Sequence, residues 1–339
     1  MVTTDEIIKI VEMRRMTFKS FGLLLKQAGT SFMNDKAPKM SASLSYYTMF
    51  SLGPVLLIAI FFANLFYGDE AIKGALFGQL KSLLGDSAAL QIQTLIQNAA
   101  ITGSVFTTII SFVTLFIGAT GVFLEIQDSI NTIWKLKVKE GASWTLMITN
   151  RLRSFSLVIS LGFLLLVSLI LNSVIEALMG ALKREFPEVT VVILYVINLA
   201  VTLFITSVLF AIIFKVLPDA VIKWSDVAVG AVFTGILFMV GKFGITFYIG
   251  SSNIGTTYGT AGSLVVLLLW VYYSSMILYF GAEFTKAYAV KFGNKIRPNV
   301  YATTYQQVNI ESNKDSIQEN EEEQETKTEQ QRVKNKQVK

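Results

Sequence analysis

The stretch GTTYGTAGSLVVLLLWVYYSSMILYFGAE, residues Gly255–Glu283, decides the fold. It opens with a turn rich in Gly and Thr, and it then runs for 22 residues without a charge, from Ala261 to Ala282. A helix rises about 1.5 Å per residue, so this run covers roughly 33 Å, and the hydrocarbon core of a bilayer is about 30 Å thick. The stretch therefore predicts a membrane-spanning helix that ends at Glu283.

The composition of the whole chain agrees with this prediction. Of the 339 residues, 53% are hydrophobic and only 16% are charged, which is too few charges for a soluble domain of this size. The chain contains no Cys and no His, so it lacks a thiol nucleophile, the commonest general base and the commonest metal ligand. We expect a membrane protein that is not an enzyme and that holds no metal or cofactor.

Uncharged runs predict six membrane spans and hence an all-α, polytopic membrane protein. The last run, 227–282, is interrupted only by Lys242 and is too long for one helix, and the Gly-rich segment 250–262 divides it in two. The six predicted spans lie near residues 44–67, 103–125, 153–177, 189–214, 227–249 and 261–283.

The distribution of Lys and Arg predicts the orientation. Seven basic residues precede the first span, four lie in loop 126–152, and four follow the last span, whereas loop 69–101 has two against three acids and loop 250–260 has none. Because basic loops stay in the cytoplasm, this alternation places both termini there. We therefore expect a multi-pass protein of a cell membrane, with both ends on the cytoplasmic side.

The two ends of the chain differ from the membrane domain, 40–297. Within segment 1–39, apolar residues recur at helical spacing over Asp5–Phe32 and basic residues occupy the other positions. This amphipathic helix either lies on the membrane or packs on the protein's own cytoplasmic face. Segment 298–339 is charged, with eight acids and six bases after residue 310, and we expect a disordered cytoplasmic tail that can be removed after about Pro298.

Small and polar residues form one face of the second span and end in two carboxylates, Glu125 and Asp128. They follow one another at steps of three and four: Thr107, Ser111, Thr114, Gly118, Gly121, Glu125 and Asp128. This face either packs closely against another helix or lines a water-accessible path, and small-residue seams of this kind are common in membrane bundles. Pro54, near the middle of the first span, predicts a kink that is either static or part of a gate.

Lys242 is the one cation well inside a predicted span. It shares a helix face with Ala231, Gly235 and Thr246, and about eight residues separate it from the outer end. Because a charge within a bilayer is costly, we expect a partner or a polar cavity rather than a side chain that reaches the headgroups. Glu176, near the outer end of the third span, is the candidate counter-charge, but a solvated helix end is the simpler explanation of this residue.

Three groups of residues resemble the YihY/BrkB family of bacterial inner-membrane proteins. The first is Ala42–Tyr47 followed by Ser51–Pro54, and the second is Gly121–Phe123 followed by Ile130–Trp134. The third and strongest group comprises Tyr258–Gly262, Leu269–Tyr273 and Gly281–Glu283. The resemblance covers roughly residues 20–295 and implies a six-helix membrane protein, often described as a transporter or virulence-associated factor, without an assigned substrate. Some members once carried a ribonuclease label, which the absence of His argues against.

The sequence thus predicts a transporter or permease whose substrate is anionic or lipid-like. Its expected partners are membrane lipids and this small-molecule or lipid substrate, and no nucleic acid. A scaffold that recruits envelope partners through loop 69–101 or the tail is the alternative, and a ribonuclease is the least favoured function. The predicted pathway residues are Lys242, Glu176, Glu125, Asp128, Tyr258 and Glu283, with Pro54 as the kink.

Overall fold

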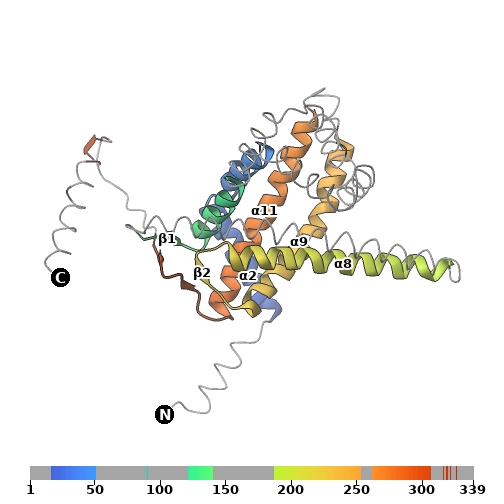
Figure 1. Cartoon of the computed structure of the whole chain (residues 1–339), viewed down its shortest axis with the longest axis horizontal. Coiled ribbons are helices and arrows are strands. Elements are labelled where there is room, and N and C mark those ends of the chain that lie inside the picture. Colours follow the sequence, from blue (N-terminus) through green and yellow to red (C-terminus); the bar gives the residue numbers. More distant parts are fainter. Residues whose placement is uncertain are drawn as a thin grey trace, which may run out of the picture. The chain divides into compact units, whose positions relative to one another are not determined.

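The computed structural model describes residues 17–50, 121–139, 187–252 and 262–306, together with Leu90 and five single positions after residue 315 (Figure 1). Residues 37–50 and 121–133 are helical. The other elements, in chain order, are α2 Phe18–Asn34, β1 Leu136–Val138, α8 Pro187–Val216, β2 Ala220–Val221, α9 Trp224–Ser251, α11 Gly262–Lys291, β3 Arg297–Pro298 and β4 Ala302–Thr304.

Three of the described helices are long and apolar enough to cross a membrane. Their apolar segments are Val196–Val216 in α8, Trp224–Ile249 in α9 and Leu264–Lys291 in α11. They correspond to the predicted spans 189–214, 227–249 and 261–283, which confirms these three as helices. The first and second predicted spans are described only in part and the third, 153–177, lies outside the described residues, so the number six stays a prediction.

Helices α9 and α11 pack closely through the same short pattern on both helices. Residues 230–234 read GAVFT and residues 281–285 read GAEFT. A Cβ atom built on Gly230 would lie 1.9 Å from Thr285 Oγ1, and one built on Gly281 would lie 2.1 Å from Thr234 Oγ1. Each Thr therefore fits against the Gly of the other helix, and the two helices touch where neither Gly has a side chain. We call this contact the Gly-Thr seam.

Both Thr side chains of the Gly-Thr seam are satisfied within their own helix. Thr234 Oγ1 donates to the carbonyl of Gly230, and Thr285 Oγ1 donates to the carbonyl of Gly281, each at 2.6 Å. Small residues at i and i+4 with Thr hydroxyls bonded to the backbone are typical of close helix contacts in membranes. Helix α9 also contacts α8, where a Cβ on Gly235 would lie 2.7 Å from Ser207 Oγ.

Helix α2 packs on α11. Thr17 caps its first turn, since Thr17 Oγ1 accepts a hydrogen bond from the amide of Ser20. Leu24 and Ala28 are fully buried and belong to one cluster with Phe284. For this part of the predicted amphipathic helix, the structure shows packing on the protein itself, which was one of the two alternatives. Residues 1–16 lie outside the described residues.

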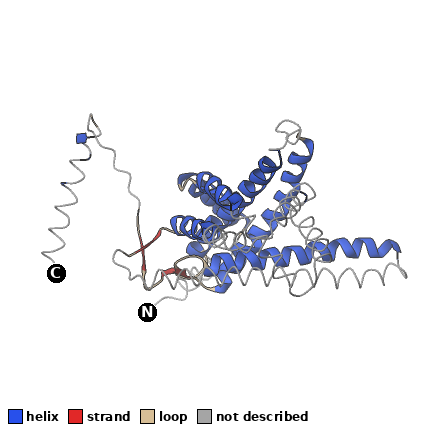
Figure 2. Cartoon of the chain, turned by 45° about the horizontal axis from the view of Figure 1, so that its top comes forward, coloured by secondary structure: helices blue, strands red, loops and turns tan. Residues whose placement is uncertain are grey.

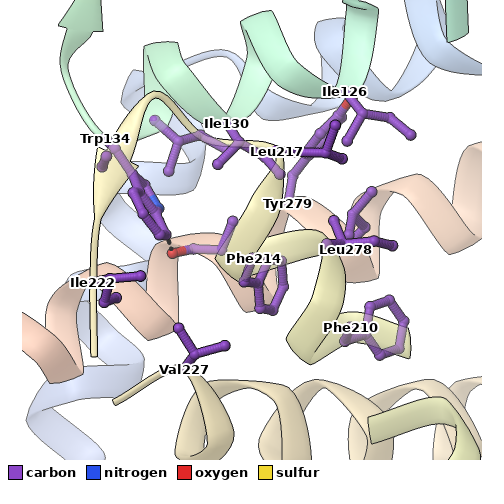
Figure 3. Packing of buried hydrophobic residues seen from close by; sticks show 14 of the residues in the cluster. Ile126, Ile130, Trp134, Phe210, Phe214, Leu217, Ile222, Val227, Leu278 and Tyr279 are labelled. Carbon is purple, nitrogen blue, oxygen red and sulfur yellow. Dashed lines mark hydrogen bonds between the residues drawn. The ribbon is translucent and has the colours of Figure 1, made fainter. Parts of the chain in front are cut away.

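A larger hydrophobic core joins helix 121–133 to α8, α9 and α11 (Figure 3). Ile130 and Tyr279 are fully buried in it, and Phe214 of α8 lies in the same cluster. The indole Nε1 of Trp134 donates to the carbonyl of Ala282 at 3.3 Å, which ties the end of helix 121–133 to α11. This core forms at one end of the helix bundle, where α8 ends, α9 begins and α11 ends. We call this end of the bundle the strand end, because the four short strands described next also lie there.

Four short strands lie at the strand end and add a small β component to the predicted all-α fold (Figure 2). Strands β1 and β4 are antiparallel with Val138 opposite Ala302, and β2 and β3 are antiparallel with Ala220 opposite Pro298. Residues 302–304, which the sequence analysis assigned to the tail, pair with β1. The chain after Pro298 forms β4, whose backbone pairs with a strand more than 160 residues earlier.

Two compact units divide the chain, residues 1–304 and residues 305–339. Within the second unit, Gln318 and Glu319 are helical and exposed. The predicted disorder of the tail stays a prediction.

Candidate functional site

Glu283, one of the predicted pathway residues, is buried at the strand end of α11. Only 1% of its surface is exposed. Its Oε2 lies 4.0 Å from the ammonium of Lys286, one turn further along the helix. That ammonium instead donates to the carbonyl of Ile133 at 2.5 Å. Among the described residues, no hydrogen-bond donor reaches Glu283 Oε1.

A second ion pair lies against Glu283. Lys135 Nζ is 2.5 Å from Asp35 Oδ1, and the two side chains are 29% and 8% exposed, respectively. The negative charge of Asp35 acts on Glu283. The four residues Asp35, Lys135, Glu283 and Lys286 form what we call the four-charge cluster.

The backbone places the four-charge cluster through two left-handed turns. Asp35 ends α2, and the next residue, Lys36, has φ 57°. Lys135 follows helix 121–133 and itself has φ 58°. A residue with a Cβ atom rarely adopts this conformation, which costs roughly 1–2 kcal/mol. Both turns redirect the chain at a helix end, and each presents one member of the cluster.

A third acidic residue at the strand end, Asp219, is surrounded by donors. It is 3% exposed, and its carboxylate accepts from Gln127 Nε2 at 3.0 Å, Asn131 Nδ2 at 2.8 Å and the Tyr301 hydroxyl at 3.0 Å. Its backbone amide donates to Asn131 Oδ1, and its carbonyl accepts from the amide of Asn299. A buried carboxylate with this many donors is stably held, and it joins its own segment to helix 121–133 and to the chain around Tyr301.

Asp226 connects the start of α9 to the chain that follows α11. Its carboxylate accepts from the amide of Asn294 at 2.8 Å and from the Ser225 hydroxyl at 3.1 Å. A Cβ on Gly293 would lie 2.7 Å from this carboxyl group, so the turn after α11 has no room for a side chain there. An acid in the first turn also interacts favourably with the positive end of the α9 dipole.

Lys242 is half-buried on α9. Of the residues predicted to share its face, Ala231 is fully buried, Gly235 contacts α8, and Thr246 is exposed. The residue beside it, Gly241, lies against the side chain of Tyr273 on α11. Lys242 is therefore at the border between packed and exposed surface in an otherwise apolar helix.

Glu125 and Asp128 lie on helix 121–133, with Glu125 half-buried and Asp128 exposed. Partial desolvation raises the pKa of Asp128, and the negative charges of Glu125 and Asp219 raise it further. The nearby Gly121 packs on the ring of Tyr47, since a Cβ built there would lie 3.3 Å from that ring. This end of the small-residue face thus contacts another helix, as expected for close packing.

Three predicted residues, Glu176, Tyr258 and Pro54, lie outside the described residues. The pairing of Lys242 with Glu176 and the kink at Pro54 therefore stay predictions. Within the described ranges, no group of three or more Asp or Glu could hold a metal ion.

The sequence did not predict Asp35, Lys135 or the residues around Asp219. Asp35 and Lys135 are 100 positions apart, and Asp219 bonds to residues 82 to 92 positions away. The sequence offered one local sign of this site: Asn131 belongs to the motif Ile130–Trp134, in which polar residues stand among apolar ones.

Comparisons with known proteins identify relatives of this chain. The family model "Virulence factor BrkB" matches residues 28–302. A UPF0761 membrane protein of Ralstonia nicotianae is 25% identical over 260 residues, which is 76% of this chain and 56% of that protein. One of Pseudoalteromonas atlantica is 25% identical over 263 residues, 76% of this chain and 82% of that protein. One of Mannheimia succiniciproducens is 24% identical over 283 residues, 80% of this chain and 92% of that protein.

The chain matches only about half the length of some of these relatives, such as the Ralstonia protein. No solved structure matches the chain.

Proposed function

The chain belongs to the virulence factor BrkB family of membrane proteins, and on that premise we propose that it is a permease for an anionic or lipid-like substrate. We propose further that it has no enzymatic activity, because the sequence contains neither His nor Cys for acid-base or nucleophilic chemistry.

The observation that carries this proposal is the four-charge cluster in and beside a helix that is apolar enough to span the membrane. Glu283 and Lys286 lie within the apolar segment Leu264–Lys291, and Glu283 is almost fully buried. Ionisable residues in such segments are costly and usually mark transport pathways or proton relays.

Lys242 supports an anionic substrate. It is the only charged residue of α9 between Asp226 and Ser251, and a half-buried ammonium in an apolar helix attracts negative charge. A phosphate or carboxylate group fits this requirement, whether it belongs to a soluble ion or to a lipid headgroup.

We propose that the strand end faces the cytoplasm of a bacterial cell and that both termini lie on that side. The basic residues near the strand end support this orientation: Lys215, Lys223, Lys291, Lys295 and Arg297. The other end of the α9–α11 hairpin, residues 250–260, has no basic residue.

Flux measurements in liposomes that contain the purified protein test the proposal. One arm follows efflux of inorganic phosphate, and the other follows movement of a fluorescent anionic phospholipid between leaflets. We expect the wild-type protein to exceed empty liposomes in one arm. In that arm, Lys242→Ala should lower the rate by at least about tenfold, equivalent to 1.4 kcal/mol of lost substrate stabilisation, and Lys242→Arg should retain part of it.

Lys295→Ala is the matched control, because it removes the same charge from an exposed residue beyond α11. Its rate should equal that of the wild-type protein. Full activity of Lys242→Ala would remove Lys242 from the pathway. If the wild-type protein gives no flux in either arm, the permease proposal is wrong and the scaffold function becomes the better one.

A further inference from the structure

Two carboxyl groups of the four-charge cluster each have one buried oxygen without a hydrogen-bond donor among the described residues. Asp35 Oδ2 and Glu283 Oε1 are both buried, and among the described residues neither has a hydrogen-bond partner. The carboxyl group of Asp35 nevertheless lies close enough to that of Glu283 for its negative charge to act on it. Two carboxylate oxygens are both acceptors, so a direct contact between them requires a hydrogen that neither has when ionised.

The neighbouring lysines do not supply that hydrogen. Lys135 Nζ contacts the other oxygen of Asp35, Oδ1, at 2.5 Å. Lys286 Nζ donates to the carbonyl of Ile133 at 2.5 Å and remains 4.0 Å from the other oxygen of Glu283, Oε2. These two ammonium groups and the carboxyl group of Asp35 are the charged groups of the described residues that act on Glu283, from the turn after helix 121–133, α11 and the end of α2.

A single proton between the two carboxyl groups resolves this conflict. One group then donates and the other accepts, so both inner oxygens are satisfied and the repulsion between two buried negative charges is removed. The remaining negative charge is compensated by the lysines. Asp219, by contrast, accepts from three donors and leaves no place for a proton.

We propose that Asp35 and Glu283 share one proton and form a proton-binding site at the strand end. The charge of this site changes by one when the proton leaves. The proposal does not depend on the permease proposal, and its test uses no transport substrate.

Amide substitutions in the purified full chain, held in lipid nanodiscs, test the shared proton. Glu283→Gln supplies a permanent donor to Asp35 Oδ2, and Asp35→Asn supplies one to Glu283 Oε1. Each single variant should therefore melt at or above the wild-type temperature at neutral pH. The double variant leaves both lysines without a negative charge, and it should melt at least about 3 °C below either single variant.

Asp219→Asn is the matched control, because it makes the same carboxyl-to-amide change at a buried acid of the strand end. Its amide would meet the donors of Gln127, Asn131 and Tyr301, so we expect a lower melting temperature. If Glu283→Gln and Asp35→Asn each lower the melting temperature as Asp219→Asn does, and their effects add in the double variant, the two acids form separate ion pairs and the proposal is wrong.

The response to pH provides a second readout. Raising the pH should remove the shared proton and place two negative charges together, so the wild-type melting temperature should fall while both single variants change less. The infrared spectrum of the wild-type protein at neutral pH should show a protonated carboxyl band that is absent from both single variants. A wild-type spectrum without this band would overturn the proposal even if one variant fails to fold.

Discussion

At the scale of single residues, Lys36 and Lys135 both have a left-handed backbone conformation, but their side chains differ in their contacts. Lys36 is exposed, whereas the ammonium of Lys135 contacts Asp35. Because glycine adopts this backbone conformation without strain, we expect Lys36→Gly to raise the free energy of unfolding by about 1 kcal/mol. Thermal melting in nanodiscs measures the change.

Lys135→Gly relieves the same backbone strain but removes the partner of Asp35. A buried carboxylate without its partner is strongly destabilising, so we expect this variant to melt below the wild-type protein. Equal stabilisation by both substitutions would show that the Lys135–Asp35 ion pair contributes nothing to the stability of the strand end.

The sequence predicted one member of the four-charge cluster and not the others. Glu283 was identified because it ends an apolar run and belongs to a motif. Asp35 and Lys135 stand among other charged and polar residues near predicted helix ends, where an acid or base is ordinarily solvated. Only the tertiary packing of α2 and helix 121–133 against α11 brings them to Glu283, and no local pattern encodes that packing.

At the scale of elements, the Gly-Thr seam determines how closely α9 and α11 approach. Gly281→Ala would place a Cβ atom 2.1 Å from Thr234 Oγ1 and 2.6 Å from its Cγ2. The helices must then move apart, and we expect a loss of roughly 1–3 kcal/mol in the free energy of unfolding. The melting temperature in nanodiscs should fall accordingly.

Gly244→Ala on α9 is the matched control for the seam. A Cβ built on Gly244 has no atom within 4 Å, so the substitution adds only the higher helix propensity of alanine. Its melting temperature should stay the same or rise. If both alanine variants melt alike, the close approach at the Gly-Thr seam does not limit stability.

Hydrophobic runs predicted the helices of the second half of the chain well and their ends less well. Helix α11 was expected to stop at Glu283 but continues to Lys291, two turns further. A charge ends an uncharged run in the sequence, but it does not end the backbone hydrogen bonding of the helix. The sequence did not predict the strands. Each strand has only two or three residues and pairs with a distant partner, so it leaves no periodic pattern in the sequence.

At the scale of the whole molecule, the segment between Pro298 and Tyr305 belongs to the membrane domain. Truncation after Gln306 retains β4 and Tyr301, so the protein should accumulate in the membrane at the wild-type level. Truncation after Pro298 removes β4, the donor from Tyr301 to Asp219 and the amide of Asn299 that bonds to its carbonyl. We expect this protein to be lost or to melt well below the wild-type protein.

Membrane fractions that are quantified by immunoblot against a cytoplasmic-side tag distinguish the two truncations. Equal amounts of both proteins, with equal melting temperatures, would show that the strand end forms without its C-terminal strand. That result would support the predicted tail boundary at residue 298.

The pairing of β1 with β4 has a consequence for how the protein is made. The ammonium of Lys139 donates to the carbonyl of Val300, and these residues are 161 positions apart. A ribosome adds about 5–20 residues per second, so the β1 segment leaves the ribosome roughly 10–30 s before its partner is synthesised. During that interval Asp219 can accept hydrogen bonds from Gln127 and Asn131 but not yet from Tyr301, which has not been synthesised. The strand end therefore cannot be complete until residues 299–304 have been synthesised.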